Sequence, residues 1–170
     1  MSTPDQLFDL PRLRPRLGAT RDSLRLLHVI VGRDLRPGTL ADEIHAASRG
    51  AIRVECVAGL GRALDHLRAH PAALVLLQAD DLDVARVALA ELKLAQPALP
   101  VVLLTEAEDD EAAVSAVRAG AEDCLWREAA SGARIVRAML CALERTSHAA
   151  TLRTQAVTDP LTGLPPQILR

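Results

Sequence analysis

The sequence AALVLL at residues 72–77 is wholly apolar, and so is VVLL at residues 101–104, directly after Pro100. Apolar runs of this length are typical of strands that are covered on both faces, as in a parallel sheet. An amphipathic stretch follows each run: residues 84–94 precede Pro97, and residues 112–117 end at Gly120. Pro and Gly at these places are helix stop signals. The two strand–helix pairs therefore predict an α/β core.

The same alternation continues on both sides of this core. Strands are predicted at residues 26–31 and 52–59, followed by helices over residues 39–49 and 60–67. Toward the C-terminus, a short strand is predicted at residues 123–126, and Ser131 is expected to cap a helix that starts at Gly132. Five successive strand–helix pairs with right-handed crossovers place helices on both faces of one parallel sheet. We therefore predict a doubly wound, five-stranded (βα)5 sandwich.

Composition limits the class of protein. The chain has 170 residues, of which 49% are hydrophobic and 25% charged, so it can bury a core. A net charge of −2 and an aromatic content of 1% give no reason to expect nucleic-acid binding. No apolar run approaches the roughly 20 residues that cross a bilayer, and no signal peptide is evident at the N-terminus. We expect a cytoplasmic protein that binds neither nucleic acid nor membrane.

Few side chains suggest a cofactor or a catalytic site. Cys56, Cys124 and Cys141 lie far apart without a CxxC pair, which argues against a zinc site or a disulfide framework. His66 and His70 are four residues apart on one predicted helix, and could bind a metal only with partners that the sequence does not identify. A solvated helix face is the simpler interpretation. We predict no cofactor, no metal and no catalytic residue.

The predicted last helix is unusually long. Gly and Pro are absent from Ala133 to Thr158, so the helix is expected to continue past the domain as a connector over residues 146–158. An apolar heptad runs along it, although two of its positions are Thr146 and Arg153. Such a weak seam favours pairing with a second copy, and a single solvated helix is the alternative. The candidate dimer residues are Val136, Met139, Leu143, Ala150 and Val157.

Two segments carry a family resemblance. ALVLLQADDLD at residues 73–83 resembles the third strand and following loop of response-regulator receiver domains. Residues 100–128 resemble the fourth and fifth strands with the helix between them, and AGAEDCLWR at residues 119–127 follows the family pattern AGA-x-D-(Tyr/Phe)-L-x-K. The resemblance covers residues 23–145 and implies a flavodoxin-like receiver fold, after an N-terminal arm at residues 1–22.

The residues needed for phosphotransfer are missing. The family implies an acidic pair that holds magnesium after the first strand, and Gly32 and Arg33 stand at those positions. It implies a phosphoacceptor aspartate at the end of the third strand, where this chain has Gln78. An amide has no anionic oxygen to attack phosphorus, and Mg²⁺ is held poorly without carboxylates. The alternative is a shifted acceptor at Asp80. We interpret the segment as a pseudo-receiver that is not phosphorylated.

The family's switch residues are retained only in part. Thr105 matches the hydroxyl residue that contacts the phosphoryl group in receivers. Arg127 stands in place of the family's lysine. Cys124 stands in place of the aromatic residue that turns inward on activation, and its side chain is too small for that rotation.

A second resemblance lies at the C-terminal end. VTDPLTGLP at residues 157–165 is similar to the entry motif of GGDEF domains, D-x-L-T-G-L-x-N-R, although Pro166 and Gln167 depart from it. Residues 159–170 would be the start of such a domain, without its signature loop. A chance turn at the end of a helix is the alternative.

The residues favour a non-enzymatic regulatory and dimerisation domain of a bacterial cyclic-di-GMP signalling protein, linked to two-component phosphorelays by resemblance. The expected partners are a second copy of the chain and a downstream GGDEF domain in the same polypeptide, and the full-length output is left open between cyclase, phosphodiesterase (EAL) and inert scaffold. Two alternatives remain: a monomeric docking domain that recruits another protein, and a receiver phosphorylated at an unusual aspartate.

Overall fold

The computed structural model describes residues 28–32, 39–79, 81–106 and 108–157. All ten predicted elements are present in these residues. The strands are β1 (His28–Gly32), β2 (Val54–Ala58), β3 (Leu74–Ala79), β4 (Val101–Thr105) and β5 (Asp123–Trp126). The helices are α2 (Thr39–Ala47), α3 (Leu60–Ala69), α4 (Leu82–Ala95), α5 (Asp110–Arg118) and α6 (Gly132–Val157).

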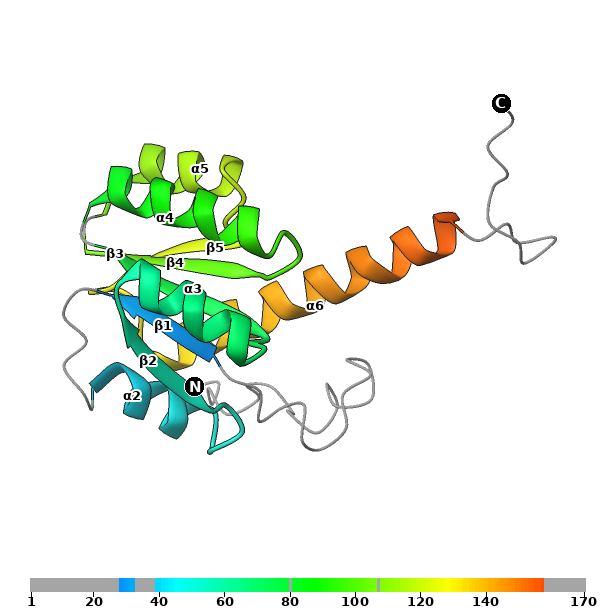
Figure 1. Ribbon diagram of the computed structural model, residues 1–170. Helices are drawn as coiled ribbons and strands as arrows, with labels where there is room; N and C mark the ends of the chain where they lie inside the picture. Colours follow the sequence, from blue (N-terminus) through cyan, green and yellow to red (C-terminus); the bar gives the residue numbers. More distant parts are fainter. Residues whose placement is uncertain (1–27, 33–38, 80, 107, 158–170) are drawn as a thin grey trace, which may run out of the picture.

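The five strands form one parallel sheet in the order β2-β1-β3-β4-β5. This is the flavodoxin-like order of doubly wound folds, in which the order of the strands reverses between β1 and β3. Helices α3, α4 and α5 cover one face, and α2 and α6 cover the other (Figure 1). The predicted fold class is confirmed.

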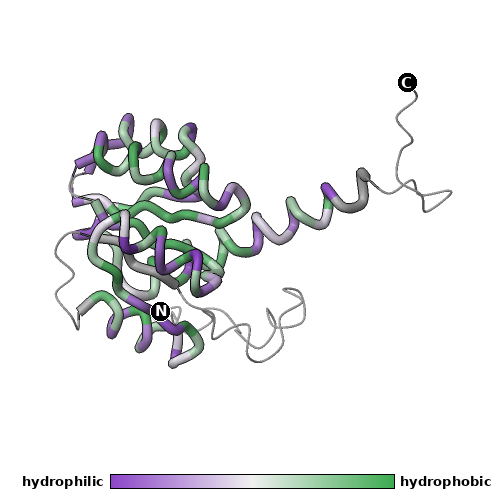
Figure 2. Tube along the Cα trace, viewed as in Figure 1, coloured by the Kyte–Doolittle hydropathy of each residue, from purple (hydrophilic) through white to green (hydrophobic). Residues whose placement is uncertain are grey.

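The apolar runs are explained by the alternation of side chains along the strands. In β3, Val75 and Leu77 pack under α3, α4 and α5, whereas Leu74 and Leu76 pack against α2 and α6. All four are buried, so both faces of the strand must be apolar. Figure 2 shows hydrophobic residues concentrated in these central strands.

Local signals end and start the helices as the sequence predicts. The Ser131 hydroxyl accepts a hydrogen bond from the Arg134 amide at 3.4 Å, at the start of α6. Gly120 ends α5 with a φ of 104°, a conformation that favours glycine. Asp81, which the sequence analysis did not predict as a cap, caps α4, because its Oδ1 accepts hydrogen bonds from the amides of Asp83 at 2.7 Å and Val84 at 3.2 Å.

Helix α6 has two distinct parts. Its first half packs on the sheet, and its second half projects away from the body of the domain (Figure 1). Val136 and Met139 are buried in the core between the sheet, α2 and α6, and Leu143 packs against that core. The expected dimer seam is therefore corrected at these positions, since Val136 and Met139 are already covered by the domain's own core. Ala150 is exposed, and Val157 is the last residue of the helix.

Several predictions concern residues outside the described ranges. These are the N-terminal arm at residues 1–22, Arg33, Asp80, and the GGDEF-like segment at residues 159–170. None of the helices in the described part of the chain is both long and apolar enough to cross a lipid bilayer.

Candidate functional site

The candidate site lies where the central strands end at the carboxyl edge of the sheet. In doubly wound folds, ligands bind outside this edge, near the reversal of strand order. Gly32 ends β1, Gln78 is the penultimate residue of β3, and Thr105 ends β4. Gln78 lies beside Leu104 in the sheet, and Ala79 lies beside Thr105. The fold thus brings the three sequence-predicted positions to one edge.

Gln78 is bonded to a carboxylate that the sequence analysis did not single out. Its side-chain Nε2 donates a hydrogen bond to Glu106 Oε1 at 3.1 Å. Glu106 directly follows Thr105, so the sequence could have identified it as a site residue only by its place after a predicted strand. The contact joins residues that are 28 positions apart, and no local pattern predicts it. At the position of the expected phosphoacceptor, the structure has an amide that donates to an acid.

Contacts from β5 and the residue after it also hold the segment at Thr105 and Glu106. Trp126 Nε1 donates a hydrogen bond to the backbone oxygen of Glu106 at 2.9 Å, and the Arg127 amide donates to the Thr105 oxygen at 2.7 Å. Three contacts from two neighbouring strands therefore hold residues 105 and 106. These contacts position the start of the β4–α5 connection.

Thr105 and Cys124 form a second, mostly apolar part of the site. Thr105 is buried, and its hydroxyl donates to the Leu125 oxygen at 3.3 Å. Cys124 packs against the core beneath α3, α4 and α5. Burial raises the pKa of the Cys124 thiol, while a hydrogen bond with the Thr105 hydroxyl acts in the opposite direction and Asp123 raises it further. Cys124 is therefore a neutral packing residue at physiological pH.

Arg127 does not point its charge at Gln78. Its NH2 group lies 2.9 Å from Glu43 Oε1 of α2, and its NH1 group donates to the Ala130 oxygen at 3.3 Å. The ion pair joins the turn after β5 to α2, which packs beside the start of α6. Arg127 thus fastens α2 to the β5–α6 turn, a role that the sequence analysis missed because Glu43 is 84 residues away.

The chemistry available at this edge is limited. Among the residues described, no three His, Cys, Asp or Glu side chains form a group that could hold a metal ion. Asp81 is occupied as the cap of α4, and Asp83 lies 3.9 Å from Arg86. An amide side chain is not a nucleophile toward phosphorus. The described residues thus place at this edge an amide, Gln78, that is hydrogen-bonded to the Glu106 carboxylate.

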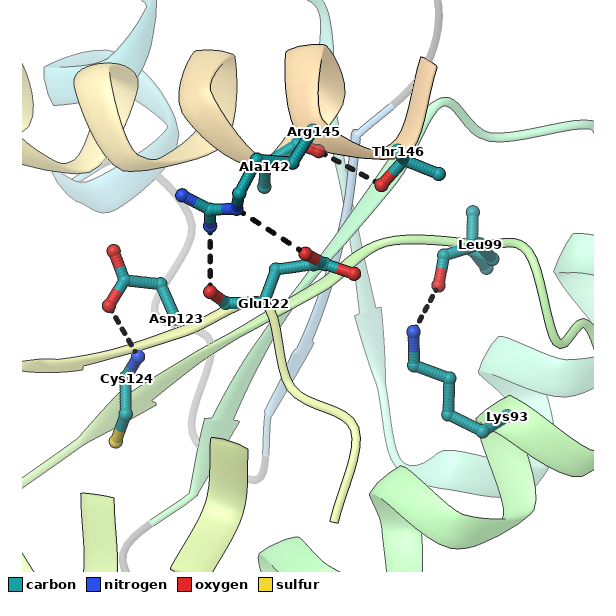
Figure 3. A network of polar contacts seen from close by, with 8 residues as sticks. All are labelled: Lys93, Leu99, Glu122, Asp123, Cys124, Ala142, Arg145 and Thr146. Carbon is teal, nitrogen blue, oxygen red and sulfur yellow. Dashed lines mark hydrogen bonds and ion pairs between the residues drawn. The ribbon is translucent and has the colours of Figure 1, made fainter. Parts of the chain in front are cut away.

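The opposite, amino edge of the sheet has its own polar contacts (Figure 3). Arg145 of α6 donates to the Glu122 backbone oxygen at 2.7 Å, and its Nε lies 3.6 Å from Glu122 Oε2. Lys93 Nζ donates to the Leu99 oxygen at 2.9 Å. Burial lowers the pKa of Lys93, and the Glu122 charge partly opposes this shift. These contacts fasten the middle of α6 and the end of α4 to the sheet.

A cavity of about 500 Å³ lies near this edge, between the end of α2 and the start of β2. Its lining includes Asp42, His45 and Arg53. All three side chains are exposed, so the cavity is an open surface depression that is remote from Gln78.

Comparison with solved structures identifies the fold. NtrX from Brucella abortus, in complex with ATP, aligns with a TM-score of 0.67 and 21% identity over 85% of this chain and 32% of that chain. The receiver domain of the Francisella response regulator 1452 aligns with a TM-score of 0.57 and 15% identity over 71% of this chain and 98% of that chain. The pilus assembly protein CpaE from Caulobacter crescentus CB15 aligns with a TM-score of 0.58 and 19% identity over 69% and 92%.

The chain therefore has the fold of response-regulator receiver domains. It spans about a third of the length of the NtrX chains that it matches. No protein-family model matches the sequence, and no curated protein matches it either.

Proposed function

We propose that this chain is a cytoplasmic regulatory module of bacterial signal transduction, which has a receiver fold and acts by protein contact instead of phosphotransfer. The observation that carries the proposal is the Gln78–Glu106 hydrogen bond at the place of the phosphoacceptor. A receiver in the usual sense needs a carboxylate there, and this chain has an amide that donates one of its two N–H groups to Glu106.

Electrostatics support the same conclusion. An approaching phosphoryl group would bring its anionic oxygens to the Glu106 carboxylate, and like charges at such short range repel. In receivers a divalent cation offsets this repulsion. Here Gly32 stands at one of the two acidic-pair positions and cannot contribute a carboxylate.

We further propose that the domain precedes a GGDEF-type output domain and pairs two such domains through α6. The support is the unbroken course of α6 to Val157 and the similarity of residues 157–165 to the GGDEF entry motif. Leu152 in the second half of the helix is 52% exposed, which leaves an apolar side chain for contact with another copy.

Phosphorylation is tested by incubating the chain with acetyl phosphate and Mg²⁺ and measuring its intact mass. We expect no phosphoryl adduct on the wild-type chain and none on Gln78→Asp, in which the restored acid faces Glu106. Trp126 is the single tryptophan, and it touches the Glu106 loop, so its fluorescence reports directly on this edge. Beryllofluoride with Mg²⁺ is expected to leave that fluorescence unchanged.

A magnesium-dependent adduct on the wild-type chain would overturn the proposal. If the adduct disappeared in Asp80→Asn, the chain would be a receiver with a shifted acceptor. Gln78→Asn is the matched control for Gln78→Asp, since it shortens the side chain in the same way without adding charge.

Self-association is tested by light scattering on the chain and on a version that ends at Arg145. We expect a dimer that weakens when residues 146–170 are removed. A monomer at micromolar concentration that saturably captures one identified protein would favour a docking domain. Reading the gene downstream of Arg170 tests the GGDEF proposal, and a different domain there would contradict it.

A further inference from the structure

Helices α4 and α5 carry most of the exposed apolar side chains in the described part of the chain. Of the large apolar residues there that are at least half exposed, all but Leu152 of α6 lie on these two helices. They are Val84, Val87, Leu94, Val114 and Val117, which we call the α4–α5 face. The two helices are in contact and lie side by side over the sheet (Figure 1).

The side chains of the α4–α5 face are not used by the domain's own core. On α4, Val84, Val87 and Leu94 are three and seven residues apart, so they share one side of the helix. Ala85 and Leu92 are buried on the side that packs against the sheet, whereas Leu94 is 85% exposed. Contiguous exposed apolar side chains on a soluble domain mark a surface that binds another group.

The surroundings of this face are acidic. Glu91 lies one helical turn from both Val87 and Leu94, and Asp110 lies one turn before Val114; both acids are exposed. Residues 81–118 as a whole contain eight acidic and three basic side chains. One of the three, Lys93, directs its amine to the Leu99 oxygen at 2.9 Å. A ligand of the α4–α5 face should therefore combine apolar side chains with positive charge.

The chain itself contains a segment of this composition. Residues 10–17, which we call the basic segment, read LPRLRPRL and contain three arginines, three leucines and no acid. From Arg12 to Leu17, arginine alternates with leucine or proline. The basic segment thus has the positive charge and the apolar side chains that the α4–α5 face calls for.

The connection to the domain allows the basic segment to reach this face. Strand β1 begins at His28, at the amino edge of the sheet, and α4 ends at Ala95 beside the same edge, one residue after Leu94. Leu17 lies 11 positions before His28, a span of up to about 36 Å. A domain of about 120 residues has a radius of gyration of about 14 Å, so this span covers the distance around it.

We propose that the basic segment binds the α4–α5 face of its own chain, with its leucines on the exposed valines and Leu94 and its arginines near the surrounding acids. The tether keeps the basic segment at a high effective concentration, which favours its own face over that of another molecule. The contact would cover the largest exposed apolar set of the described domain. It involves neither Gln78 nor the second half of α6, so it stands or falls independently of the proposed function.

The test is limited trypsin digestion of the full chain, followed by intact mass, with cleavage after Arg12 and Arg16 as the readout. A bound segment is cut only when it dissociates, so its cleavage rate follows the unbound population. We expect cleavage to be at least severalfold faster in Val87→Asp, which places a charge on the face, and in Glu91→Lys, which repels the arginines. High salt should speed cleavage of the wild type, because it screens the attraction.

Matched control variants change the same chemistry elsewhere on the surface. Leu152→Asp alters the exposed leucine of α6, and Glu128→Lys reverses an exposed charge after β5; both should be cleaved as slowly as the wild type. Equal rates in the wild type and Val87→Asp would overturn the proposal. Protection that is lost on dilution would place the basic segment on a second copy and would overturn it too.

A measurement on the wild-type chain covers the case in which a variant misfolds. Methyl NMR should show nuclear Overhauser contacts from Leu13 or Leu17 to the valines of the α4–α5 face. Contacts of these leucines with Leu152 instead, or with no methyl group of α4 or α5, would refute the proposed contact.

Discussion

The two halves of α6 belong to one continuous helix and have different surroundings. In the first half, Ile135, Met139 and Ala142 have no exposed surface and pack between the sheet and α2. In the second half, residues 150–153 are exposed, and Leu152 is 52% exposed. An apolar repeat shows that a helix has a face to bury, and it does not show what covers that face. Here the first half is covered by its own domain.

The difference bears on how the domain would transmit a signal. At the carboxyl edge, Gln78, Glu106 and Trp126 are joined by hydrogen bonds within the protein. The second half of α6 begins at the Arg145–Glu122 contacts, and beyond them residues 150–153 are exposed. We therefore expect the surface available for regulation to lie on α6, and four comparisons between variants test how α6 is held to the domain.

The largest effect is expected from truncating the buried half. Met139→Ala should lower the free energy of unfolding by about 2–5 kcal/mol, the cost of a cavity in a packed core. Leu152→Ala, in the exposed half of the same helix, should change it by less than about 0.5 kcal/mol. Urea denaturation followed by circular dichroism measures both. Similar losses in the two variants would mean that the halves are packed alike.

The next effect concerns the place where α6 begins. A Cβ on Gly132 would lie 2.8 Å from the Glu43 backbone oxygen, so Gly132→Ala should push α2 away from α6. We expect a loss of about 1–3 kcal/mol from overpacking. Gly61→Ala is the matched control, because a Cβ there meets nothing within 4 Å; inside α3 it should stabilise by up to about 1 kcal/mol. Urea midpoints that move in the same direction would contradict the close approach of α2 and α6.

A smaller effect is expected from the ion pair beside that contact. Arg127 and Glu43 side chains are 25% and 39% exposed, so solvent screens their attraction. A double-mutant cycle with Arg127→Met and Glu43→Gln should give a coupling of about 1 kcal/mol or less, reduced further by salt. The more exposed Arg86–Asp83 pair, at 3.9 Å, should give a coupling near zero. Equal coupling energies in the two pairs would show that the Arg127–Glu43 pair does not fasten α2 to the β5–α6 turn.

The smallest effect is expected where the two halves meet. Arg145→Ala removes both contacts with Glu122 and should change global stability by about 0.5 kcal/mol or less. Hydrogen exchange at residues 143–149 should nevertheless speed up severalfold, because local opening no longer breaks these contacts. Arg153→Ala is the control in the exposed half and should leave exchange there unchanged. Unaltered exchange in Arg145→Ala would show that α6 is held by its apolar face alone.

Local patterns predicted most of the fold. The strand Asp123–Trp126 and the start of α6 at Gly132 were located from the sequence, and other boundaries moved by a few residues. Strand β3 was predicted to end at Leu77 and continues to Ala79, because pairing with β4 extends to Thr105. Hydrophobic periodicity and cap residues can be recognised from a few neighbouring positions in the sequence. The end of a strand depends instead on how far its partner strand extends.

The candidate site was predicted only in part. The positions of Gln78 and Thr105 at one edge followed from the parallel sheet, since its strands end on the same side. The partners of these side chains did not follow, because Glu106 and Glu43 contact Gln78 and Arg127 across 28 and 84 residues. Such pairs depend on how strands and helices are placed in space.

The sequence by itself determined that the chain forms a doubly wound α/β sandwich and that Gln78 stands directly after the apolar run of its third strand. Both follow from side-chain chemistry and short-range periodicity, which hold whatever the rest of the chain does. Only the tertiary structure decided that Gln78 bonds to Glu106, that Arg127 fastens α2, and that the first half of α6 is buried in its own domain. These outcomes depend on which distant surfaces come within contact distance, and that is fixed by packing of the whole domain.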